Sequence, residues 1–481
     1  MGSVGLPQFN VFGEYYNTID GKLCSTQETR HGINPATGKP NPEVPVATRE
    51  DVDTAVAAAQ KAFKSWSKVP YSERQQALRN FADALEKHQD DFAKLLTQEQ
   101  GKPLMFAKAE AASGVTWIRT LSGFELPEEI VEEDDTKKII VRHTPLGVAV
   151  GIVPWNFPIQ LACGKITPAV VTGNTIIIKP SPFTPYCDLK LGELAQQFFP
   201  PGVVQVLSGD DNLGPWFTAH PGPDKISFTG STVTGKKVME SASKTLKRVT
   251  LELGGKDPTI VCPDVDIATV APKVATLAFL NSGQICLAIK RIYVHEDIYE
   301  PFLKAMVDFT KTLKVGDGAE EGTFLGPVQN SMQYEKVKTF FSDIEKSGQK
   351  VAVGGVNEDK PGYFITPTLI DRPAEDSKLA TEEPFGPIVP VMTWKDEQEV
   401  IDRANGTRMG LGASVWASDL DTANRMAQKL EAGSVWVNTH LELDPRAPFG
   451  GHKESGVGFE WSAAGLKAYC NSQTLYLKKK A

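Results

Sequence analysis

The 481-residue sequence predicts an α/β fold with two doubly wound parallel-sheet domains and a small exposed β element. Three observations predict this fold. Short, continuous apolar runs occur in two series, and stretches of helix length separate the runs within each series. Two other segments alternate polar and apolar residues, as strands with one exposed face do. At about 150 residues per domain, the length allows two or three domains.

The first series of apolar runs follows a helical region. Residues 50–113 are rich in Ala, Glu, Lys and Gln, and their apolar residues recur at helical spacing. The runs that come after this region are continuous rather than alternating, which is typical of strands buried on both faces. They cover residues 148–153, 175–178, 203–207, 225–228 and 249–253.

The second series begins near Thr259 and predicts another parallel sheet. Its later runs cover residues 291–294, 388–392, 413–416 and 434–437. The exposed strands are expected at residues 139–142 and 474–477. Because free strand edges are usually covered or paired, we expect these two segments to find partners.

Composition and charge exclude several classes of protein. Hydrophobic residues make up 41% and charged residues 23%, as in a globular protein, and the net charge of −8 argues against a nucleic-acid or anionic-membrane partner. The six cysteines are scattered without C-x-x-C spacing, so we expect no metal site and reduced thiols. Residues 1–6 lack the features of a signal peptide, and no apolar stretch reaches transmembrane length. We therefore expect a cytoplasmic protein.

Cys286, which ends the segment Asn-Ser-Gly-Gln-Ile-Cys at residues 281–286, is the candidate nucleophile. A free cysteine is more often a small buried apolar residue than a nucleophile. The residues around Cys286 therefore decide whether it is a candidate nucleophile. Gly283 allows a tight turn, and residues 274–280 form an apolar run that predicts a buried helix or strand. Such a run would hold the cysteine loop rigidly.

Glu252 is the candidate general base. It lies between Leu251 and Leu253 in a run that Gly254 ends. A glutamate on a strand more often faces solvent. If this one faces a cleft, loss of solvation raises its pKa, as a base working near neutral pH requires.

Asn156 is the candidate amide donor. It lies between Pro154 and Pro158, in a segment that can continue neither a helix nor a central strand. An asparagine there is commonly only a turn residue. Alternatively its side-chain N–H₂ stabilises an oxyanion, with the Cys286 backbone N–H as second donor.

A phosphate-binding segment is predicted at residues 228–235, Phe-Thr-Gly-Ser-Thr-Val-Thr-Gly. It follows an apolar run and opens a helical stretch, so free N–H groups at the helix start can face phosphate oxygens. The Gly-Ser-Thr part reads equally well as an ordinary helix N-cap. No G-x-G-x-x-G fingerprint follows a strand in this sequence.

These segments resemble those of the NAD(P)-dependent aldehyde dehydrogenase superfamily, from residues 33–38 near the start to residues 448–456 near the end. The resemblance implies a covalent mechanism with Cys286 as nucleophile, Glu252 as the base that activates water, and Asn156 as oxyanion donor. Lys165 and Glu460 match positions near the proton-transfer route, although such residues are usually solvated charges.

The resemblance also implies a division of the chain into a Rossmann-like cofactor domain, a catalytic domain and a β oligomerisation element. The cofactor domain is expected at residues 1–126 and 147–254, and the catalytic domain at 255–455. The oligomerisation strands are expected at 127–146 and within the return segment 456–481. A homodimer or homotetramer follows from this resemblance.

The implied cofactor is NAD or NADP, with a slight preference for NAD. Many NAD-preferring relatives carry a Glu three residues after the lysine at position 179, whereas this chain has Pro182. A carboxylate there would repel a 2′-phosphate, and proline cannot. The residues implied in cofactor binding are Ile152, Val153, Pro154, Trp155, Lys179, Ser181, Pro182, Gly214, Phe228, Thr229, Gly230, Ser231, Thr234, Leu253, Gly254, Glu383 and Phe385.

The implied substrate is a small-molecule aldehyde, medium-chain aliphatic or aromatic, because the matching pocket positions are nearly all apolar. Gly164 falls where some relatives carry a bulky aromatic residue, so a wider pocket is expected. The alternatives are a semialdehyde dehydrogenase that uses Arg446 or Arg119, or a non-catalytic structural protein. The pocket positions are Phe157, Gln160, Leu161, Ile285, Leu287, Leu441, Leu443 and Phe449.

Overall fold

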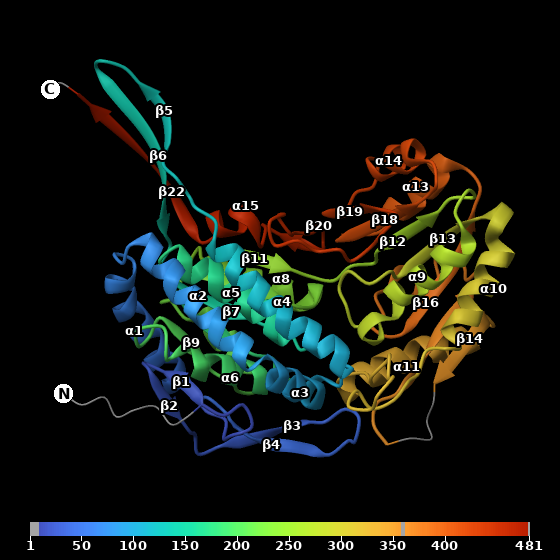
Figure 1. Cartoon of the computed structure of the whole chain (residues 1–481), viewed down its shortest axis with the longest axis horizontal. Coiled ribbons are helices and arrows are strands. Elements are labelled where there is room, and N and C mark those ends of the chain that lie inside the picture. The colour runs from blue at the N-terminus through green and yellow to red at the C-terminus, as the bar shows by residue number, and fades with distance from the viewer. Residues whose placement is uncertain (1–8, 357–360, 480–481) are drawn as a thin grey trace.

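The computed structural model describes residues 9–356 and 361–479. The segment 1–6, which argued against a signal peptide, lies outside the described residues. Within the described ranges, no helix has both the length and the apolar character that crossing a bilayer requires. The elements form two sheets with helices around them and a separate β arm (Figure 1), which confirms the predicted α/β fold.

The first sheet contains the first predicted series of strands. Its strand order is β2-β1-β9-β8-β7-β10-β11-β21, and β9, β8, β7, β10 and β11 run parallel. The parallel strands are β7 (Val148–Ile152), β8 (Thr175–Lys179), β9 (Val204–Val206), β10 (Lys225–Thr229) and β11 (Arg248–Glu252). Antiparallel strands extend the edges, namely β1 (Asn17–Ile19), β2 (Lys22–Cys24) and β21 (Gly456–Val457).

Helices cover both faces of this sheet, because neighbouring apolar residues on each strand point to opposite faces. On β8, Ile176 and Ile178 belong to one core cluster and Ile177 to another, and all three are fully buried. Burying each such side chain contributes about 1.5–3 kcal/mol. One face carries α2 (Tyr71–Lys87), α4 (Leu104–Ser122), α5 (Pro158–Val171) and α6 (Tyr186–Ala195), and the other carries α1 (Arg49–Trp66), α7 (Leu213–Ala219) and α8 (Thr232–Ser243).

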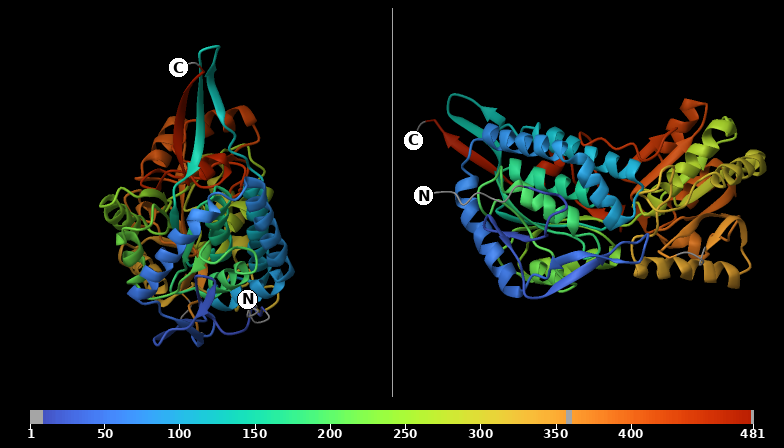
Figure 2. Two further views of the ribbon diagram at one scale, coloured as in Figure 1. Left: turned by 90° about the vertical axis from the view of Figure 1, so that its left-hand side faces the viewer. Right: turned by 60° about the horizontal axis from the view of Figure 1, so that its bottom comes forward.

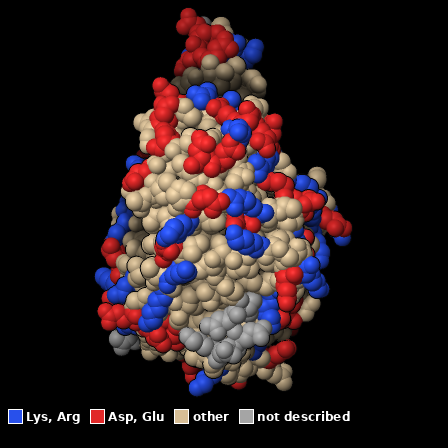
Figure 3. Space-filling view, turned by 90° about the vertical axis from the view of Figure 1, so that its right-hand side faces the viewer, with Lys and Arg blue, Asp and Glu red and all other residues tan. Residues whose placement is uncertain are grey.

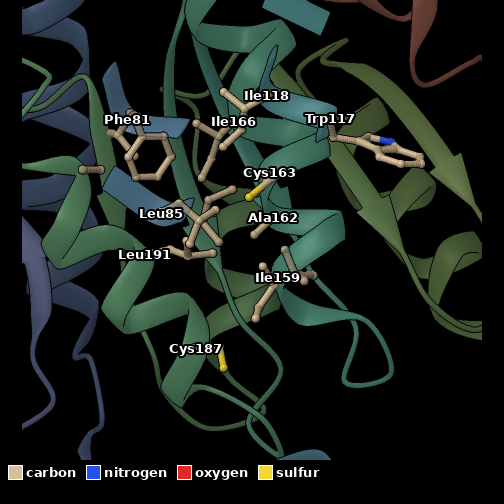
Figure 4. Close-up of a cluster of buried hydrophobic side chains, with 14 of the residues drawn as sticks. Phe81, Leu85, Trp117, Ile118, Ile159, Ala162, Cys163, Ile166, Cys187 and Leu191 are labelled. Carbon is tan, nitrogen blue, oxygen red and sulfur yellow. The ribbon is translucent and has the colours of Figure 1, made fainter. Parts of the chain in front are cut away.

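Helix α5 lies at the centre of the larger core cluster. Figure 4 shows Ile159 and Ile166 of this helix beside Leu85 of α2 and Ile118 of α4. Pro158 occupies the first turn of α5, where its missing N–H costs nothing. The start of the helix, and with it the loop that precedes it, is therefore fixed against a packed core.

The second sheet contains the second predicted series. Its order is β14-β15-β16-β13-β12-β18-β19, parallel except for β14. The strands are β12 (Pro258–Val261), β13 (Arg291–His295), β14 (Lys350–Val356), β15 (Ile365–Asp371), β16 (Ile388–Trp394), β18 (Gly412–Trp416) and β19 (Ser434–Val437). The sequence reading missed β14, which contains two glycines, and β15, which contains a proline.

Helices also cover both faces of the second sheet. The cluster that includes Val261 and Ile292 packs against α9 (Ile267–Phe279) and α10 (Tyr299–Thr310), and the cluster that includes Ile260 packs against α13 (Glu397–Asn405) and α14 (Leu420–Ala427). The apolar run at 274–280 is therefore largely helix. Figure 3 shows acidic and basic side chains interspersed on the outer face of this half. The exact domain boundaries stay a prediction.

The remaining elements are short or peripheral. Two antiparallel pairs are β3 (Thr29–Ile33) with β4 (Pro40–Pro45), and β17 (Met409–Gly410) with β20 (His452–Lys453). The other helices are α3 (Gln89–Gln100), α11 (Ser331–Lys346), α12 (Lys378–Thr381) and α15 (Ser462–Lys467), with short 3₁₀ helices at Leu280–Gly283 and Glu296–Ile298.

The two exposed alternating segments form strands that pair with each other. β6 (Lys137–Pro145) is antiparallel to β22 (Cys470–Lys478) over its whole length, and β5 (Glu129–Glu133) completes a three-stranded arm. The arm projects from the body (Figures 1 and 2). It exposes Ile130, Val131 and Tyr476 by 54%, 57% and 76%.

Candidate active site

The loop that carries Cys286 begins with a tight left-handed turn. Asn281, Ser282 and Gly283 have φ angles of 52°, 56° and 70°. A Cβ atom on Gly283 would lie 2.2 Å from the Gly386 carbonyl oxygen, so only glycine fits. The predicted role of Gly283 in the turn is confirmed.

Buried side chains hold the backbone carbonyls on either side of Cys286. Asn156 Nδ2 donates to the Gln284 carbonyl at 3.0 Å, and His440 Nε2 lies 2.7 Å from the Leu287 carbonyl. Burial lowers the pKa of His440 to about 3, so its ring is neutral. Because a carbonyl only accepts, Nε2 carries the proton. The sequence reading missed His440, since nothing local marks it.

Lys290 holds the two backbone carbonyls that lie between those of Gln284 and Leu287. Its Nζ donates to the Ile285 carbonyl at 2.9 Å and to the Cys286 carbonyl. It also forms an ion pair with Glu383 Oε1 at 3.2 Å. The Lys290 side chain is only 3% exposed. The sequence reading did not identify this residue either.

The Cys286 thiol is protonated at rest. Burial raises its pKa to about 12, and the positive charge of Lys290 opposes this rise. The negative charges of Asp257, Glu383 and Glu252 raise the pKa further. The thiol must therefore pass its proton to an acceptor before it can act as a nucleophile.

Glu252 lies at the carboxyl end of β11 and is 2% exposed. Neither of its carboxylate oxygens has a hydrogen-bond partner among the described residues. Burial raises its pKa well above the usual value, the Glu460 charge adds to this, and Lys165 opposes it. The predicted direction of the pKa shift is confirmed, and an unpartnered buried carboxylate is free to bind a proton or a water molecule.

Lys165 and Glu460 form a buried ion pair beside Glu252. Their side chains are 0% and 5% exposed, so they are not solvated surface charges. Ser227 completes the group, since its Oγ donates to Glu460 Oε1 at 2.7 Å and accepts from Lys165 Nζ at 3.0 Å. These groups form a connected polar chain next to the candidate base.

A second buried ion pair fixes Asn156. Lys102 Nζ pairs with Glu110 and donates to the Asn156 carbonyl at 3.1 Å. Glu110 Oε1 accepts the Ile159 N–H at 3.0 Å, at the start of α5. One hydrogen of the Asn156 amide is used by the Gln284 carbonyl, and the other remains available as a donor. No local pattern in the sequence marks Lys102 or Glu110.

The predicted cofactor residues converge at the carboxyl ends of adjacent strands. Ile152 on β7 is opposite Lys179 on β8 and Phe228 on β10, while Thr229 on β10 is opposite Glu252 on β11. In open α/β sheets this edge is where ligands bind. The loops that follow these strands contribute Val153, Pro154, Trp155, Ser181, Pro182, Gly230, Ser231, Leu253 and Gly254.

The geometry around helix α8 fits a phosphate group. Ser231 caps the helix, and its Oγ accepts the Thr234 N–H at 3.2 Å. The other N–H groups at a helix start lack partners within the helix, and the buried Thr229 Oγ1 has no partner among the described residues. The predicted order of strand, loop and helix is confirmed.

Two further groups of residues, one around Lys179 and one around Glu383 and Phe385, fit the sugar and ring parts of a dinucleotide. Lys179 is buried with a pKa lowered to about 8, donates to the Pro180 carbonyl at 2.8 Å, and lies beside Gly214. Glu383 Oε1 accepts the Gly255 N–H at 3.2 Å. The Phe385 ring meets that of Trp155 edge to face at 5.3 Å.

The predicted pocket residues share one apolar cluster with Cys286. Ile285, Leu287 and Phe449 are buried in it, and the other apolar members pack against it. These are Phe157, Leu161, Leu441 and Leu443, while Gln160 is half-buried on α5.

The expectation of a wider pocket at Gly164 is wrong. A Cβ atom on Gly164 would lie 3.3 Å from Trp461 Nε1 and 3.7 Å from Trp117. The Trp461 ring stacks on Phe449 at 4.5 Å and meets Trp117 edge to face at 5.3 Å. Figure 4 shows Trp117 on α4 beside α5. Two indoles from distant segments therefore fill the space that the glycine leaves.

The two arginines considered for a second carboxylate are engaged elsewhere. Arg446 is 75% exposed and pairs with Asp444. Arg119 pairs on the surface with Asp83 at 2.7 Å and with Glu86 at 2.8 Å. The semialdehyde alternative is therefore not favoured.

Comparison with known proteins is consistent across three kinds of match. Residues 23–475 match the sequence model of the aldehyde dehydrogenase family. The chain is similar to the aldehyde dehydrogenase LUC3 of a Fusarium species, at 42% identity over 97% of this chain and 100% of the relative. It is 37% identical to the phenylacetaldehyde dehydrogenase of Pseudomonas fluorescens, over 98% and 95% of the two chains. The NAD⁺ complex of an aldehyde dehydrogenase from Bacillus cereus superposes with a TM-score of 0.95, at 35% identity over 98% of each chain.

Proposed function

The chain belongs to the aldehyde dehydrogenase family, and from that premise we propose that it oxidises an apolar aldehyde to the carboxylic acid with NAD(P), through a thioester on Cys286. One observation carries the proposal. Cys286 lies on a loop whose flanking carbonyls are fixed, beside the Asn156 amide and within electrostatic range of the unpartnered Glu252 carboxylate.

The first step is attack of the Cys286 sulfur on the aldehyde carbon. The thiol passes its proton to a solvent water molecule, the C–S bond forms as the carbonyl π bond breaks, and the carbonyl oxygen of the aldehyde becomes an oxyanion. The free hydrogen of the Asn156 amide and the Cys286 backbone N–H stabilise this oxyanion. The Lys102–Glu110 pair holds Asn156 in place from behind, so no reorganisation is needed at the moment of attack.

The second step converts the thioester to the acid. Bound NAD(P) would supply the acceptor for the hydride of the thiohemiacetal carbon, and loss of that hydride would leave the thioester on Cys286. Glu252 then takes a proton from water, and the resulting hydroxide attacks the thioester and releases the Cys286 sulfur. The proton then leaves Glu252 toward the Lys165–Glu460 pair. The charge of Glu460 raises the Glu252 pKa, and the charge of Lys165 lowers it.

The cofactor is held at the strand ends. The first turn of α8 binds the pyrophosphate, Lys179 binds the adenosine ribose, and Glu383 with Phe385 binds the nicotinamide ribose and ring. The support is the convergence of these residues on one sheet edge, together with the Thr229 hydroxyl, which has no partner among the described residues, and the start of helix α8 just after it.

The proposed substrates are medium-chain aliphatic and aromatic aldehydes. The cluster around Cys286 is apolar, and Phe157, Phe449, Trp117 and Trp461 give it aromatic walls. Flat aromatic side chains favour hydrophobic and aromatic ligands. The relation to a phenylacetaldehyde dehydrogenase supports the same class.

The absorbance of NAD(P)H formed with a panel of aldehydes tests this function. We expect turnover with phenylacetaldehyde and hexanal, and kcat/KM at least about tenfold lower for succinate semialdehyde, whose carboxylate finds no counter-charge in an apolar wall. Absence of turnover with every aldehyde, under both cofactors, would support a non-catalytic protein instead.

Cofactor choice is expected to depend on Pro182. Pro182→Glu places a carboxylate beside Ser181, where it accepts from the ribose hydroxyls and repels a 2′-phosphate. Two charges about 4 Å apart at an effective dielectric constant near 20 interact by about 4 kcal/mol, and a quarter of that changes affinity several-fold. The ratio of kcat/KM for NAD over NADP should rise, mainly by loss with NADP.

Kinetics with both cofactors at one fixed aldehyde concentration provide the measurement. Pro180→Ala is the matched control, since it changes a neighbouring proline without adding charge. If Pro182→Glu and the control leave the same ratio as the native enzyme, residue 182 does not face the ribose.

We also propose that the β5–β6–β22 arm joins subunits in a homodimer or homotetramer. Its exposed Ile130, Val131 and Tyr476 side chains are apolar area that a partner could cover. In light scattering, Val131→Asp should shift the particle mass toward the monomer, and Met332→Asp on α11 should not. An unchanged mass for Val131→Asp would assign the interface to another surface.

A further inference from the structure

We infer that Lys290 is a positioning residue that fixes the Cys286 loop and Glu383 in one arrangement and supplies the positive charge that favours the Cys286 thiolate. The inference rests on the proposed function, because it needs Cys286 as nucleophile and Glu383 as a cofactor ligand. Neither the motifs of the sequence nor the mechanism above gives Lys290 a part.

The Lys290 ammonium has three partners at this one place. It donates to the Ile285 carbonyl at 2.9 Å and to the Cys286 carbonyl, and it forms an ion pair with Glu383 Oε1 at 3.2 Å. An ammonium group buried to this degree needs full pairing to be stable. One side chain thus joins the nucleophile loop to the loop of the proposed cofactor ligand.

Lys290 also sets the direction in which the Glu383 carboxylate points. Glu383 Oε1 accepts the Gly255 N–H at 3.2 Å and forms the ion pair with Lys290. Oε2 forms no hydrogen bond with the described residues and lies 2.3 Å from the ideal position of a Cβ on Gly254. Lys290 therefore leaves one carboxylate oxygen of Glu383 free for a ribose hydroxyl.

Charged residues near Cys286 act on its thiolate in opposite directions. Asp257 lies before β12, Glu383 follows α12, and Glu252 ends β11, and the charges of all three disfavour the Cys286 thiolate. Among the groups with the largest effects on this thiol, Lys290 is the one whose charge favours the thiolate. The Lys290 backbone N–H donates to the Asp257 carbonyl at 3.0 Å, so the start of β13 is fixed as well. Loss of Lys290 would remove the positive charge that opposes these three carboxyl groups.

The test is the rate at which iodoacetamide alkylates Cys286, measured without aldehyde or cofactor from about pH 6 to about pH 10. Lys290→Met removes the charge and keeps the length of the side chain. We expect its alkylation rate to fall about tenfold at every pH in this range, because the range lies below the thiol pKa and a pKa higher by about one unit leaves a tenth of the thiolate. NAD(P)H binding, followed by fluorescence, should weaken several-fold, and Lys290→Arg should restore part of both losses.

Lys256→Met is the matched control. Lys256 is also buried, and its Nζ donates to the Lys290 carbonyl at 3.1 Å. Burial, with Arg291 and Lys290 nearby, lowers its pKa well below that of an ordinary lysine, so it favours the neutral amine. Its replacement removes a buried lysine whose charged form is disfavoured by burial, and we expect the alkylation profile to stay within about twofold of the native one.

Glu383→Gln gives an opposite and independent expectation. It removes a carboxylate that disfavours the thiolate, so alkylation at neutral pH should become faster while NAD(P)H binding weakens. If Lys290→Met does not fold, the alkylation rate of Glu383→Gln tests whether the charges at this place control the Cys286 thiolate. Unchanged alkylation profiles for both variants would overturn the inference. Because alkylation needs no aldehyde, an enzyme without aldehyde oxidation would refute the proposed function while the profiles still test Lys290.

Discussion

Replacing Cys286 with serine should abolish aldehyde oxidation while cofactor binding persists. A serine hydroxyl is a far weaker nucleophile at neutral pH, and within residues 9–356 and 361–479 no dedicated base is hydrogen-bonded to the side chain of residue 286. Burial already raises the pKa of the native thiol to about 12, so a hydroxyl at this place would be still harder to ionise. We expect kcat to fall at least about a thousandfold.

Steady-state kinetics and NAD(P)H fluorescence titration measure the two properties separately. Cys24→Ser is the matched control, because Cys24 is also a half-buried free thiol but lies on β2 at the far edge of the first sheet. It should keep native turnover. If Cys286→Ser kept near-native turnover, the covalent mechanism would be wrong.

Replacing Glu252 with glutamine should slow release of the acid much more than formation of the thioester. The amide keeps the shape of the buried side chain but cannot take a proton from water. General-base catalysis contributes about 10²–10⁴-fold, so the steady-state rate should fall by that factor. The first turnover does not need the base, and a burst of NAD(P)H equal to the enzyme concentration should precede the slow phase.

Stopped-flow absorbance resolves these two phases. Glu99→Gln is the matched control, since Glu99 is another fully buried carboxyl whose pKa is raised, to about 7, outside the site. It should show neither a burst nor slow turnover. Equal slowing of both phases in Glu252→Gln would remove Glu252 from the role of base.

The parts of the molecule that the sequence predicted are those with a local signature. The continuous apolar runs became the strands of two sheets because every second side chain of such a run meets one of two helix layers, as Ile176 and Ile177 do. Cys286 and Glu252 could be named as candidates from the sequence because glycines and apolar neighbours mark the cysteine loop and the end of the strand that carries Glu252. Lys165 and Glu460 became candidates through the resemblance alone, and no local pattern predicted that they would be buried.

The features that could not be predicted from the sequence depend on contacts between distant segments. Glu110 holds the N–H of Ile159, which lies 49 residues further along the chain, and His440 holds a carbonyl 153 residues away. Trp117 on α4 and Trp461, which directly precedes α15, fill the space beside Gly164. Spacing along one strand or helix carries no information about such contacts, so the wider pocket was predicted wrongly.

The covalent intermediate can be observed most directly by mass spectrometry of Glu252→Gln quenched after mixing with aldehyde and NAD(P). The account predicts an added mass equal to the aldehyde minus two hydrogen atoms, located on the peptide that contains Cys286, and absent when Cys286→Ser is combined with Glu252→Gln. A burst of NAD(P)H without this adduct, or an adduct on another residue, would contradict it.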